Sequence, residues 1–522
     1  MSTAKRAQAS RQQPGLACEA CRSKKLRCDR EQPQCGTCRA ANIACVVDFD
    51  RLPRGRKGNV KSLQTKIGTL FENLFLPNPP DPYPDANMTM FDAQGSIGGS
   101  VDIEPLKKAW PLLDLSDLIC ADLYDHLYFD RVHPFVPFLN RYRYFRQCRQ
   151  AVGDAPKPTR ALRHAMWTLA ASFSTQFQHI QKSLYAQTKM ILEELDSTAS
   201  VEPMTIKELQ ARTLLIMYEI MHMDFRTAWI SAGNCLRLAL LLRLHEIDIP
   251  EFSTRTSDAG RADLSWSEIE EQRRIFWVVF TLDCFMNLIN EAPFRMDEET
   301  ILTRLPAPEA NCQTDQPIET AFISEIISGQ RQAPSSSFVE IIITLAISGH
   351  CLLHRRRSLA ENVHHTGTTA FWDRHRAIEM LLTRKSAYSI ARPSHDSVQA
   401  DPLSLLSNMM SNALVLTMYK LIDSTKLDKT QDQPTIEKYE QKALDAAKGI
   451  TALSHVIPSL SYFKVHPFTP FPMMICIEFL LSRKSVNERA PMQAAEVWRE
   501  LQSICSVNNL AQICSSKLKI VD

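Results

Sequence analysis

Residues 18–45 read CEACRSKKLRCDREQPQCGTCRAANIAC, and this stretch decides how the N-terminal part of the chain folds. It contains the pattern CxxCx6C twice, and each cysteine of the second copy follows its counterpart in the first by 17 residues. The six cysteines are Cys18, Cys21, Cys28, Cys35, Cys38 and Cys45. Six thiolates can saturate one tetrahedral zinc ion and leave two spare, or bind two zinc ions if two sulfurs are shared. The repeat favours two Zn2+ ions, with equivalent cysteines of the two halves as the shared ligands.

The rest of the chain favours a metal over disulfides. The other nine of the 15 cysteines are scattered singly. The opening residues MSTAKRAQASRQQ have no apolar run, and no later stretch reaches about 18 uninterrupted apolar residues, so we expect neither a signal peptide nor a membrane span. We therefore expect a reducing compartment, where thiols stay available to metals. The alternative interpretation of the six cysteines is three disulfides or unconnected thiols. A segment this short has almost no hydrophobic core, so metal binding and folding should be one event.

Positive charge is concentrated around the cysteines. Residues 1–66 carry 15 Lys and Arg against 5 Asp and Glu, a balance of +10, and the remaining 456 residues carry −8. Between Cys21 and Cys28, four of six residues are basic: Arg22, Lys24, Lys25 and Arg27. A short cationic helix anchored by metal suits the DNA major groove, where lysine donates to guanine O6 and N7 while arginines hold phosphates. We therefore interpret the first half as the DNA-contacting half; the alternative for a run of charges is a solvated helix face.

These cysteines and cations together resemble the DNA-binding domain of the fungal zinc binuclear cluster transcription factors. The resemblance implies that the first and fourth cysteines, Cys18 and Cys35, bridge the two zinc ions. It implies that the remaining ligands are, for one zinc, Cys21 and Cys28, and for the other, Cys38 and Cys45. It also implies that Lys24 and Lys25 read a CGG-type triplet and that Pro33 is the loop proline between the two halves.

Four later stretches extend the resemblance. They read YFDRVHPFVPFLNRYRYF (128–145), AWISAGNCLRLALLLRLHE (228–246), EEQRRIFWVVFTLD (270–283) and PFRMDEETILTRLP (293–306). In this order they are similar to the all-helical middle homology region of the same regulators. The family usually has Gly in an LGLH turn, where this chain has Arg243 in LRLH.

Apolar residues at spacings of three and four predict a mainly α fold beyond residue 112. In SWSEIEEQRRIFWVVFTLDCFMNLI, Ser265 and Glu268 can form a capping box, and the middle is apolar nearly all round, as in a buried central helix. Other helices are expected at residues 116–131, 160–195, 205–222, 226–245, 338–356, 371–389, 404–424, 435–455 and 470–483. FVEIIITLAI, from Phe338, is rich in β-branched residues and could instead be a strand. Polar loops are expected at residues 310–337 and 390–403.

The predicted architecture is a small N-terminal binuclear zinc cluster domain, a short coiled coil and a large all-α helical regulatory domain. The expected segments are a disordered N-terminus (1–17), the zinc cluster (18–45), a linker (46–59), a coiled-coil dimerisation helix (60–76), a disordered tether (77–111) and the helical domain (112–522). The tether begins with PNPPDPYP, whose five prolines are typical of an extended segment.

The coiled coil is predicted from apolar residues at alternating steps of three and four. These residues are Val60, Leu63, Ile67, Leu70 and Leu74. A helix of about 22 Å is marginal alone, so we expect weak homodimerisation that DNA or the large domain completes. The alternative is one amphipathic helix packed on its own domain.

An enzyme and a zinc-dependent protein or RNA adaptor are the competing classes. The large domain has no GxGxxG, P-loop or GxSxG motif, because no two glycines after Gly99 are closer than 18 residues. His350 and His354 in HCLLH share a helical face, but no carboxylate or cysteine ligands accompany them in a recognisable motif, so we interpret them as surface or internally satisfied histidines. The remaining candidates are interpreted as packing, capping or core residues: His133, His245, Trp229, Trp277 and the Met-rich stretch from Met217. We therefore expect no enzyme.

The sequence predicts a nuclear, sequence-specific DNA-binding regulator of RNA polymerase II transcription. Its expected partners are double-stranded DNA with CGG-type half-sites, a second copy of the chain and the transcription machinery. The family resemblance favours an activator, and the compact linker and cluster resemble regulators of secondary-metabolite gene clusters. The alternatives are a zinc-dependent repressor, a regulator of primary or carbon metabolism, or a zinc-stabilised adaptor. Nuclear import could use the basic helix of the cluster together with Arg54, Arg56, Lys57 and Lys61.

Overall fold

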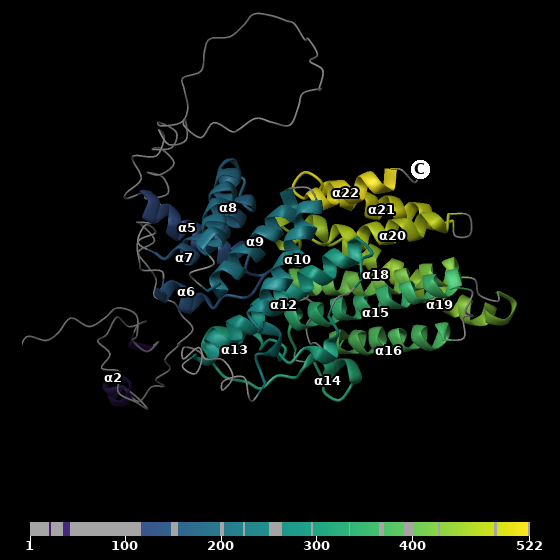
Figure 1. Cartoon of the computed structure of the whole chain (residues 1–522), viewed down its shortest axis with the longest axis horizontal. Coiled ribbons are helices and arrows are strands. Elements are labelled where there is room, and N and C mark those ends of the chain that lie inside the picture. The colour runs from purple at the N-terminus through teal and green to yellow at the C-terminus, as the bar shows by residue number, and fades with distance from the viewer. Residues whose placement is uncertain are drawn as a thin grey trace, which may run out of the picture. The chain divides into compact units, whose positions relative to one another are not determined.

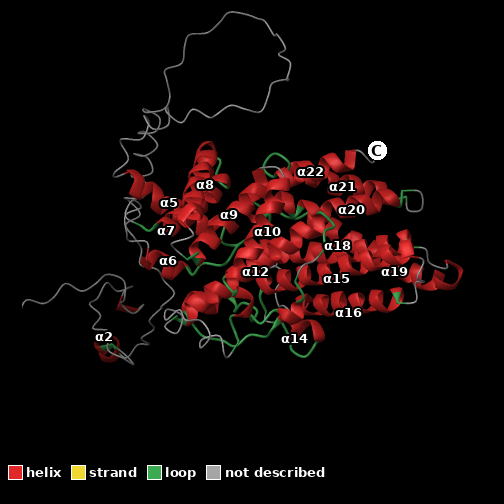
Figure 2. Cartoon of the chain, viewed as in Figure 1, coloured by secondary structure: helices red, strands yellow, loops and turns green. Residues whose placement is uncertain are grey.

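The chain divides into two compact units, Met1–Val101 and Asp102–Asp522. The computed structural model describes residues 20–21, 35–41, 116–147, 155–198, 203–222, 225–249, 264–293, 296–333, 335–364, 370–390, 401–425, 429–484 and 488–519. Every regular element among these residues is helical (Figure 2), which confirms the predicted mainly α fold. The expected N-terminal tail, linker, coiled coil and tether lie outside the described residues.

The second unit contains helices whose lengths range from six to 28 residues. Their bounds are α5 Ser116–Arg131, α6 Arg141–Gln147, α7 Lys157–Ser172, α8 Gln181–Thr198, α9 Ile206–His222, α10 Phe225–Leu241, α12 Trp266–Ile289, α13 Glu309–Thr314, α14 Ile323–Ser328, α15 Ser337–His364, α16 Phe371–Ile390, α18 Pro402–Ser424, α19 Lys429–Ser454, α20 Pro470–Ser482, α21 Ala490–Ser503 and α22 Asn509–Lys519. Short 3-10 turns connect several of them.

The helices of the second unit form one continuous packed series (Figure 1). α7 packs against α5, α8 and α9, and α9 packs against α10. α12 then lies between α10 and α15, α15 contacts α16 and α18, and α18 contacts α19 and α20. α21 and α22 close the series against α20. Because each helix buries a face on its neighbours, the core is continuous from α5 to α22.

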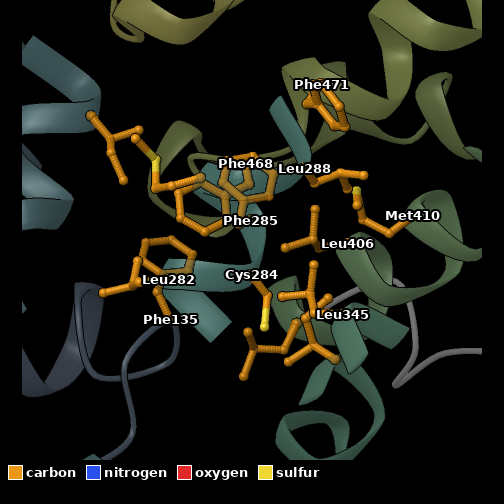
Figure 3. Close-up of a cluster of buried hydrophobic side chains, with 14 of the residues drawn as sticks. Phe135, Leu282, Cys284, Phe285, Leu288, Leu345, Leu406, Met410, Phe468 and Phe471 are labelled. Carbon is orange, nitrogen blue, oxygen red and sulfur yellow. The ribbon is translucent and has the colours of Figure 1, made fainter. Parts of the chain in front are cut away.

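α12 is the central helix that the sequence predicts. Its capping box is present: the Ser265 hydroxyl accepts from the Glu268 N–H at 3.4 Å, and the Glu268 carboxylate accepts from the Ser265 N–H at 2.8 Å. Figure 3 shows Phe285 of α12 beside Phe468, and the two rings are parallel with centroids 3.6 Å apart. Leu345 of α15 and Leu406 of α18 belong to the same buried cluster. This packing explains why the middle of α12 is apolar nearly all round.

A buried arginine links α12 to two segments far away in the sequence. Arg274 is 1% exposed and donates to the carbonyl oxygens of Pro137 at 2.6 Å and Ala307 at 2.8 Å. It also pairs with Glu270 at 3.0 Å and with Glu309 at 2.5 Å. Burial alone would raise the pKa of Glu309, but the hydrogen bond with His133 and the charge of Arg274 lower that pKa to about 2. The charge of Arg274 is therefore compensated inside the domain.

Several expectations about helices are corrected. The run predicted at 160–195 is two helices, because a turn and a 3-10 segment separate α7 from α8. The helix expected at 338–356 is confirmed: FVEIIITLAI is helical within α15, and the strand alternative is excluded, because burial between other helices overrides its β-branched composition. The loop predicted at 310–337 contains most of α13 and all of α14. α21 and α22 were not anticipated.

The two tryptophans interpreted as core residues differ. Trp277 is 0% exposed and its indole N–H donates to the Arg304 carbonyl at 2.7 Å, which confirms the prediction for this residue. Trp229 is 36% exposed on α10, so the prediction for it is wrong. α10 packs against α9 and α12 through its other face, where Ala228 and Ala232 are buried. The Met-rich stretch is core as expected, since Met217 and Met221 are buried in α9.

The LRLH turn keeps a glycine-like backbone without a glycine. Arg243 has φ 55° and ψ 34°, in the left-handed region that favours Gly. Its guanidinium pairs with Glu246 three residues later. The main-chain N–H of Leu302 donates to the carbonyl of His245 at 2.7 Å, which ties the turn to the segment after α12. The turn conformation is therefore retained despite the substitution.

α15 alone among the described helices has the length and hydropathy of a membrane-spanning segment. Its most apolar window of 18 residues is 83% buried inside the domain. α15 packs against α12, α16 and α18, and burial in this core accounts for its hydropathy.

Replacing Arg274 should destabilise the helical domain. Arg274→Met removes the closer cation of the Glu270 carboxylate, which is 1% exposed, and leaves it only Arg273 at 3.4 Å, so we expect a loss of about 3 kcal/mol in the free energy of unfolding. The matched control is Arg376→Met, because Arg376 pairs with Asp373 at the surface and the pair contributes about 0.5 kcal/mol or less. Urea unfolding followed by far-UV circular dichroism measures both variants. Equal urea midpoints for the two would contradict this account.

Candidate metal centre

The described part of the first unit is built around a short helix. α2, Gly36–Ala40, begins after Cys35, whose sulfur accepts a hydrogen bond from the main-chain N–H of Cys38 at 3.4 Å. Cys35 thus occupies the N-cap position, where Ser or Asp usually supplies the acceptor. The CxxC spacing places the Cys35 and Cys38 sulfurs at the same end of this turn. Cys21 lies in a separate short helical segment, of which residues 20–21 are described.

Three cysteine sulfurs converge within this unit. The Sγ atoms of Cys21, Cys35 and Cys38 lie within 4.8 Å of one another, and the three side chains are 0–1% exposed. Among the residues that the structure describes, no other group of three or more His, Cys, Asp or Glu side chains has ligand atoms so close together. The site is therefore buried, sulfur-rich and formed by both halves of the cysteine repeat.

The sulfur spacing fits zinc and not a disulfide. The Sγ atoms of Cys21 and Cys35 are 3.7 Å apart, whereas a disulfide bond measures about 2.05 Å. Two ligands of a tetrahedral zinc ion with Zn–S bonds of about 2.3 Å are separated by about 3.8 Å. When bound, zinc supplies positive charge that holds the thiolates together and fixes the backbone around them.

The structure brings together only part of the predicted site. Cys21, Cys35 and Cys38 converge as described. The other predicted residues lie outside the described residues: Cys18, Cys28, Cys45, Arg22, Lys24, Lys25, Arg27, Val60, Leu63, Ile67, Leu70 and Leu74.

The histidines of HCLLH have partners within the helical domain. His350 pairs with Glu298 at 2.7 Å. His354 is buried, accepts from Arg374 at 3.2 Å through Nδ1 and contacts His375 through Nε2 at 3.4 Å. Burial lowers the pKa of His354 to about 4 and that of His375 to about 3, so both rings are neutral near pH 7. These contacts agree with the interpretation of satisfied side chains.

The two other histidines that the sequence analysis singled out pair with acidic residues. His133 lies 2.9 Å from a Glu309 carboxylate oxygen, beside the Arg274 network. His245 lies 3.0 Å from Glu246 in the LRLH turn. The His133 contact therefore joins two distant segments of the helical domain, whereas the His245 contact is local to the turn. The partner of His133 is 176 residues away, so nothing in the local sequence pattern could have revealed it.

Comparison with known proteins agrees with this geometry. Residues 16–54 match the fungal Zn(2)-Cys(6) binuclear cluster domain, and residues 126–347 match the fungal specific transcription factor domain. The chain is 32% identical to the transcription factor tazR of Aspergillus terreus, over 98% of this chain and 96% of the relative. It is 32% identical to the pigment biosynthesis transcriptional activator pigB of Monascus ruber, over 98% and 95%. It is 36% identical to the azaphilone cluster-specific transcription factor azaR of Aspergillus niger, over 87% and 96%.

A buried sulfur cluster followed by a large helical domain defines a zinc cluster transcription regulator. The chain belongs to the fungal Zn(2)-Cys(6) binuclear cluster transcription factors. It is a DNA-binding regulator of transcription whose N-terminal domain binds two zinc ions, as the sequence predicts. This family is not a class of enzymes.

Removing zinc should abolish DNA binding and leave the second unit folded. We expect EDTA to release two zinc ions per chain, measured with a colorimetric zinc indicator, and to weaken specific DNA binding by about 1,000-fold or more. Far-UV circular dichroism should keep most of its helical signal, because the core from α5 to α22 is held by apolar packing. Loss of the helical signal on chelation would contradict this division.

Proposed function

We propose that this chain activates a secondary-metabolite gene cluster from the nucleus, by binding CGG-type half-sites as a homodimer. The observation that carries the proposal is the position of the Cys35 sulfur, which lies 3.7 Å from the sulfur of Cys21 and also groups with that of Cys38. The Cys35 sulfur therefore lies beside cysteines of both halves, an arrangement that supports its proposed role as a ligand shared by two zinc ions.

The proposed ligand set consists of the three converging cysteines and the three other cysteines of the repeat. In it, Cys18 and Cys35 bridge the two zinc ions. The terminal ligands are Cys21 and Cys28 for one zinc and Cys38 and Cys45 for the other. The N–H of Cys38 donates to the Cys35 sulfur, and such a bond stabilises negative charge on a ligand shared by two cations. The whole cluster then carries a formal charge of −2, which the neighbouring basic residues offset.

The proposed DNA-reading residues follow directly after the anchored Cys21. Lys24 and Lys25 would donate to guanine O6 and N7, while Arg22 and Arg27 would hold phosphates. The second half offers a single cation in the corresponding interval, Arg39, which is exposed on α2. This asymmetry supports the first half as the half that enters the groove.

The names of the relatives support an activator of a biosynthetic pathway. The Monascus ruber relative is named a pigment biosynthesis activator, and one from Monascus purpureus, 34% identical over 91% of this chain, is named a citrinin biosynthesis activator. The Aspergillus niger relative is named as specific to an azaphilone cluster. We extend this role to the present chain, with nuclear action and contact with the transcription machinery as its consequences.

Two substitutions separate base reading from phosphate contact. Lys25→Ala should lose about 1 to 3 kcal/mol of binding free energy and relax the preference at one base pair, because a base contact is removed. Arg22→Ala should weaken binding to all sequences similarly and lower the salt slope by about 1. Gel-shift titrations on CGG-containing and scrambled duplexes at several salt concentrations measure both effects. The assignment is wrong if the two variants change specificity alike, or if scrambled duplex and RNA compete as well as the CGG duplex.

Dimerisation is tested by replacing apolar residues of the predicted coiled coil, residues 60–74. Replacing Leu63 and Leu70 by Gln should reduce affinity for paired half-sites by about tenfold or more and leave affinity for a single half-site nearly unchanged. The reason is that the two zinc cluster domains of a dimer bind paired half-sites as one unit only while the coiled coil joins them. A matched control is Gln64→Ala, at a flanking position of the same helix. Unchanged paired-site affinity in the double variant would exclude this segment as the dimerisation helix.

A further inference from the structure

The helical domain contains a cavity that the DNA-binding role does not use. Its lining residues belong to α16, α18 and α19, and it has a volume of about 450 Å³. Figure 1 shows where these three helices lie in the domain. Ligand-binding cavities typically measure about 300 to 1,000 Å³ and often lie between the helices of a bundle. α16 and α19 meet at one end of the cavity, where the rings of His375 and Tyr439 have centroids 4.5 Å apart. The cavity lies outside the region matched by the fungal specific transcription factor domain, residues 126–347.

The ionisable groups on the cavity wall are already satisfied by the protein. Glu379 accepts from the Tyr439 hydroxyl at 2.6 Å and pairs with Lys442. Asp445 accepts from Lys448 at 2.9 Å and from Gln441 at 3.2 Å. A charged ligand would have to displace one of these partners, so the wall favours a neutral one.

The two remaining ionisable wall groups lead to the same conclusion. Lys385 is 2% exposed and donates to the Ser407 carbonyl at 3.4 Å. The ring of His375 contacts His354 at 3.4 Å, and burial keeps it neutral near pH 7, with its pKa lowered to about 3. Neither group therefore offers an accessible charge to a ligand, because Lys385 is almost fully buried and His375 is neutral.

The uncharged polar groups on the wall are mostly acceptors. The hydroxyls of Thr383, Ser386 and Ser411 each donate to a carbonyl one turn earlier, at 2.8 to 2.9 Å, which leaves oxygen lone pairs available. Asn412 donates to the main-chain carbonyl of Asn408 at 3.0 Å, which leaves its own amide oxygen available. Within the described part of the chain, the side-chain amide of Asn408 has no hydrogen-bond partner. This wall therefore suits a ligand that carries hydroxyl donors.

The rest of the wall is apolar and aromatic. Leu382, Val415, Met418 and Ala446 line it together with the ring of Tyr439. A polyol would bury its hydroxyl groups against these apolar side chains without hydrogen bonds, which is unfavourable. A hydroxylated aromatic ring instead packs its apolar face on them. We propose that this cavity binds a small neutral aromatic compound carrying at least one hydroxyl group. The proposal does not rest on the DNA-reading role, because binding is measured without DNA.

The test is a fluorescence titration of the full zinc-loaded chain with 2-naphthol and, as the matched probe without a hydroxyl donor, 2-methoxynaphthalene. We expect saturable binding of one 2-naphthol per chain and about fivefold weaker binding of 2-methoxynaphthalene, the effect of one lost hydrogen bond. Absence of saturable binding, or equal affinity for the two probes, would overturn the proposal.

Two variants assign the binding to this cavity. Val415→Trp fills the space and should abolish binding of both probes, whereas Lys420→Trp adds the same ring at an exposed position of α18 and should leave binding unchanged. Asn408→Leu should weaken 2-naphthol about fivefold with little effect on 2-methoxynaphthalene, which keeps the test decisive if Val415→Trp does not fold. Far-UV circular dichroism checks the fold of each variant. Unchanged binding in folded Val415→Trp or in Asn408→Leu would refute the assignment.

Discussion

The N-terminal domain depends on one constraint, which is that three buried cysteine sulfurs lie within 4.8 Å of one another. Thiolates at this spacing repel each other, and only a closely bound cation makes the arrangement favourable. The segment is too short to bury an apolar core, so the metal replaces one. α2 begins directly after Cys35, and four basic residues follow Cys21 in the sequence, so the proposed DNA-reading residues adjoin a cysteine of the sulfur cluster.

The helical domain uses a different source of stability. α12 is enclosed on nearly all sides, its Phe285 stacks on Phe468, and Arg274 connects it through hydrogen bonds to the segments at Pro137 and Ala307. None of these contacts requires a metal. The two units can therefore carry separate tasks, with DNA recognition in the first and, through the cavity between α16, α18 and α19, a response to a small molecule in the second.

Some of this could be predicted from the sequence because the information is local. The cysteine spacing predicted the sulfur cluster, and the pattern after Ser265 predicted both the capping box and the buried helix. The break between α7 and α8 was missed because helical apolar spacing continues through it, and Trp229 was misplaced because spacing does not say which face is covered. The Arg274 network and the cavity join helices remote in sequence, so no spacing could reveal them. Arg243, one of three non-glycine residues with positive φ in the described part of the chain, shows that the left-handed conformation usual for a family glycine can be adopted by another residue.

The central claim is that two zinc ions share the Cys35 sulfur. Native mass spectrometry of the full chain, which counts bound zinc directly, tests it most sharply when Cys35→Ala and Cys38→Ala are compared. The account predicts two zinc ions on the unmodified chain, none retained stably by Cys35→Ala, and one retained by Cys38→Ala, because the first variant removes a ligand of both ions and the second a ligand of one. Fewer than two zinc ions on the unmodified chain, or the same zinc count in the two variants, would contradict it.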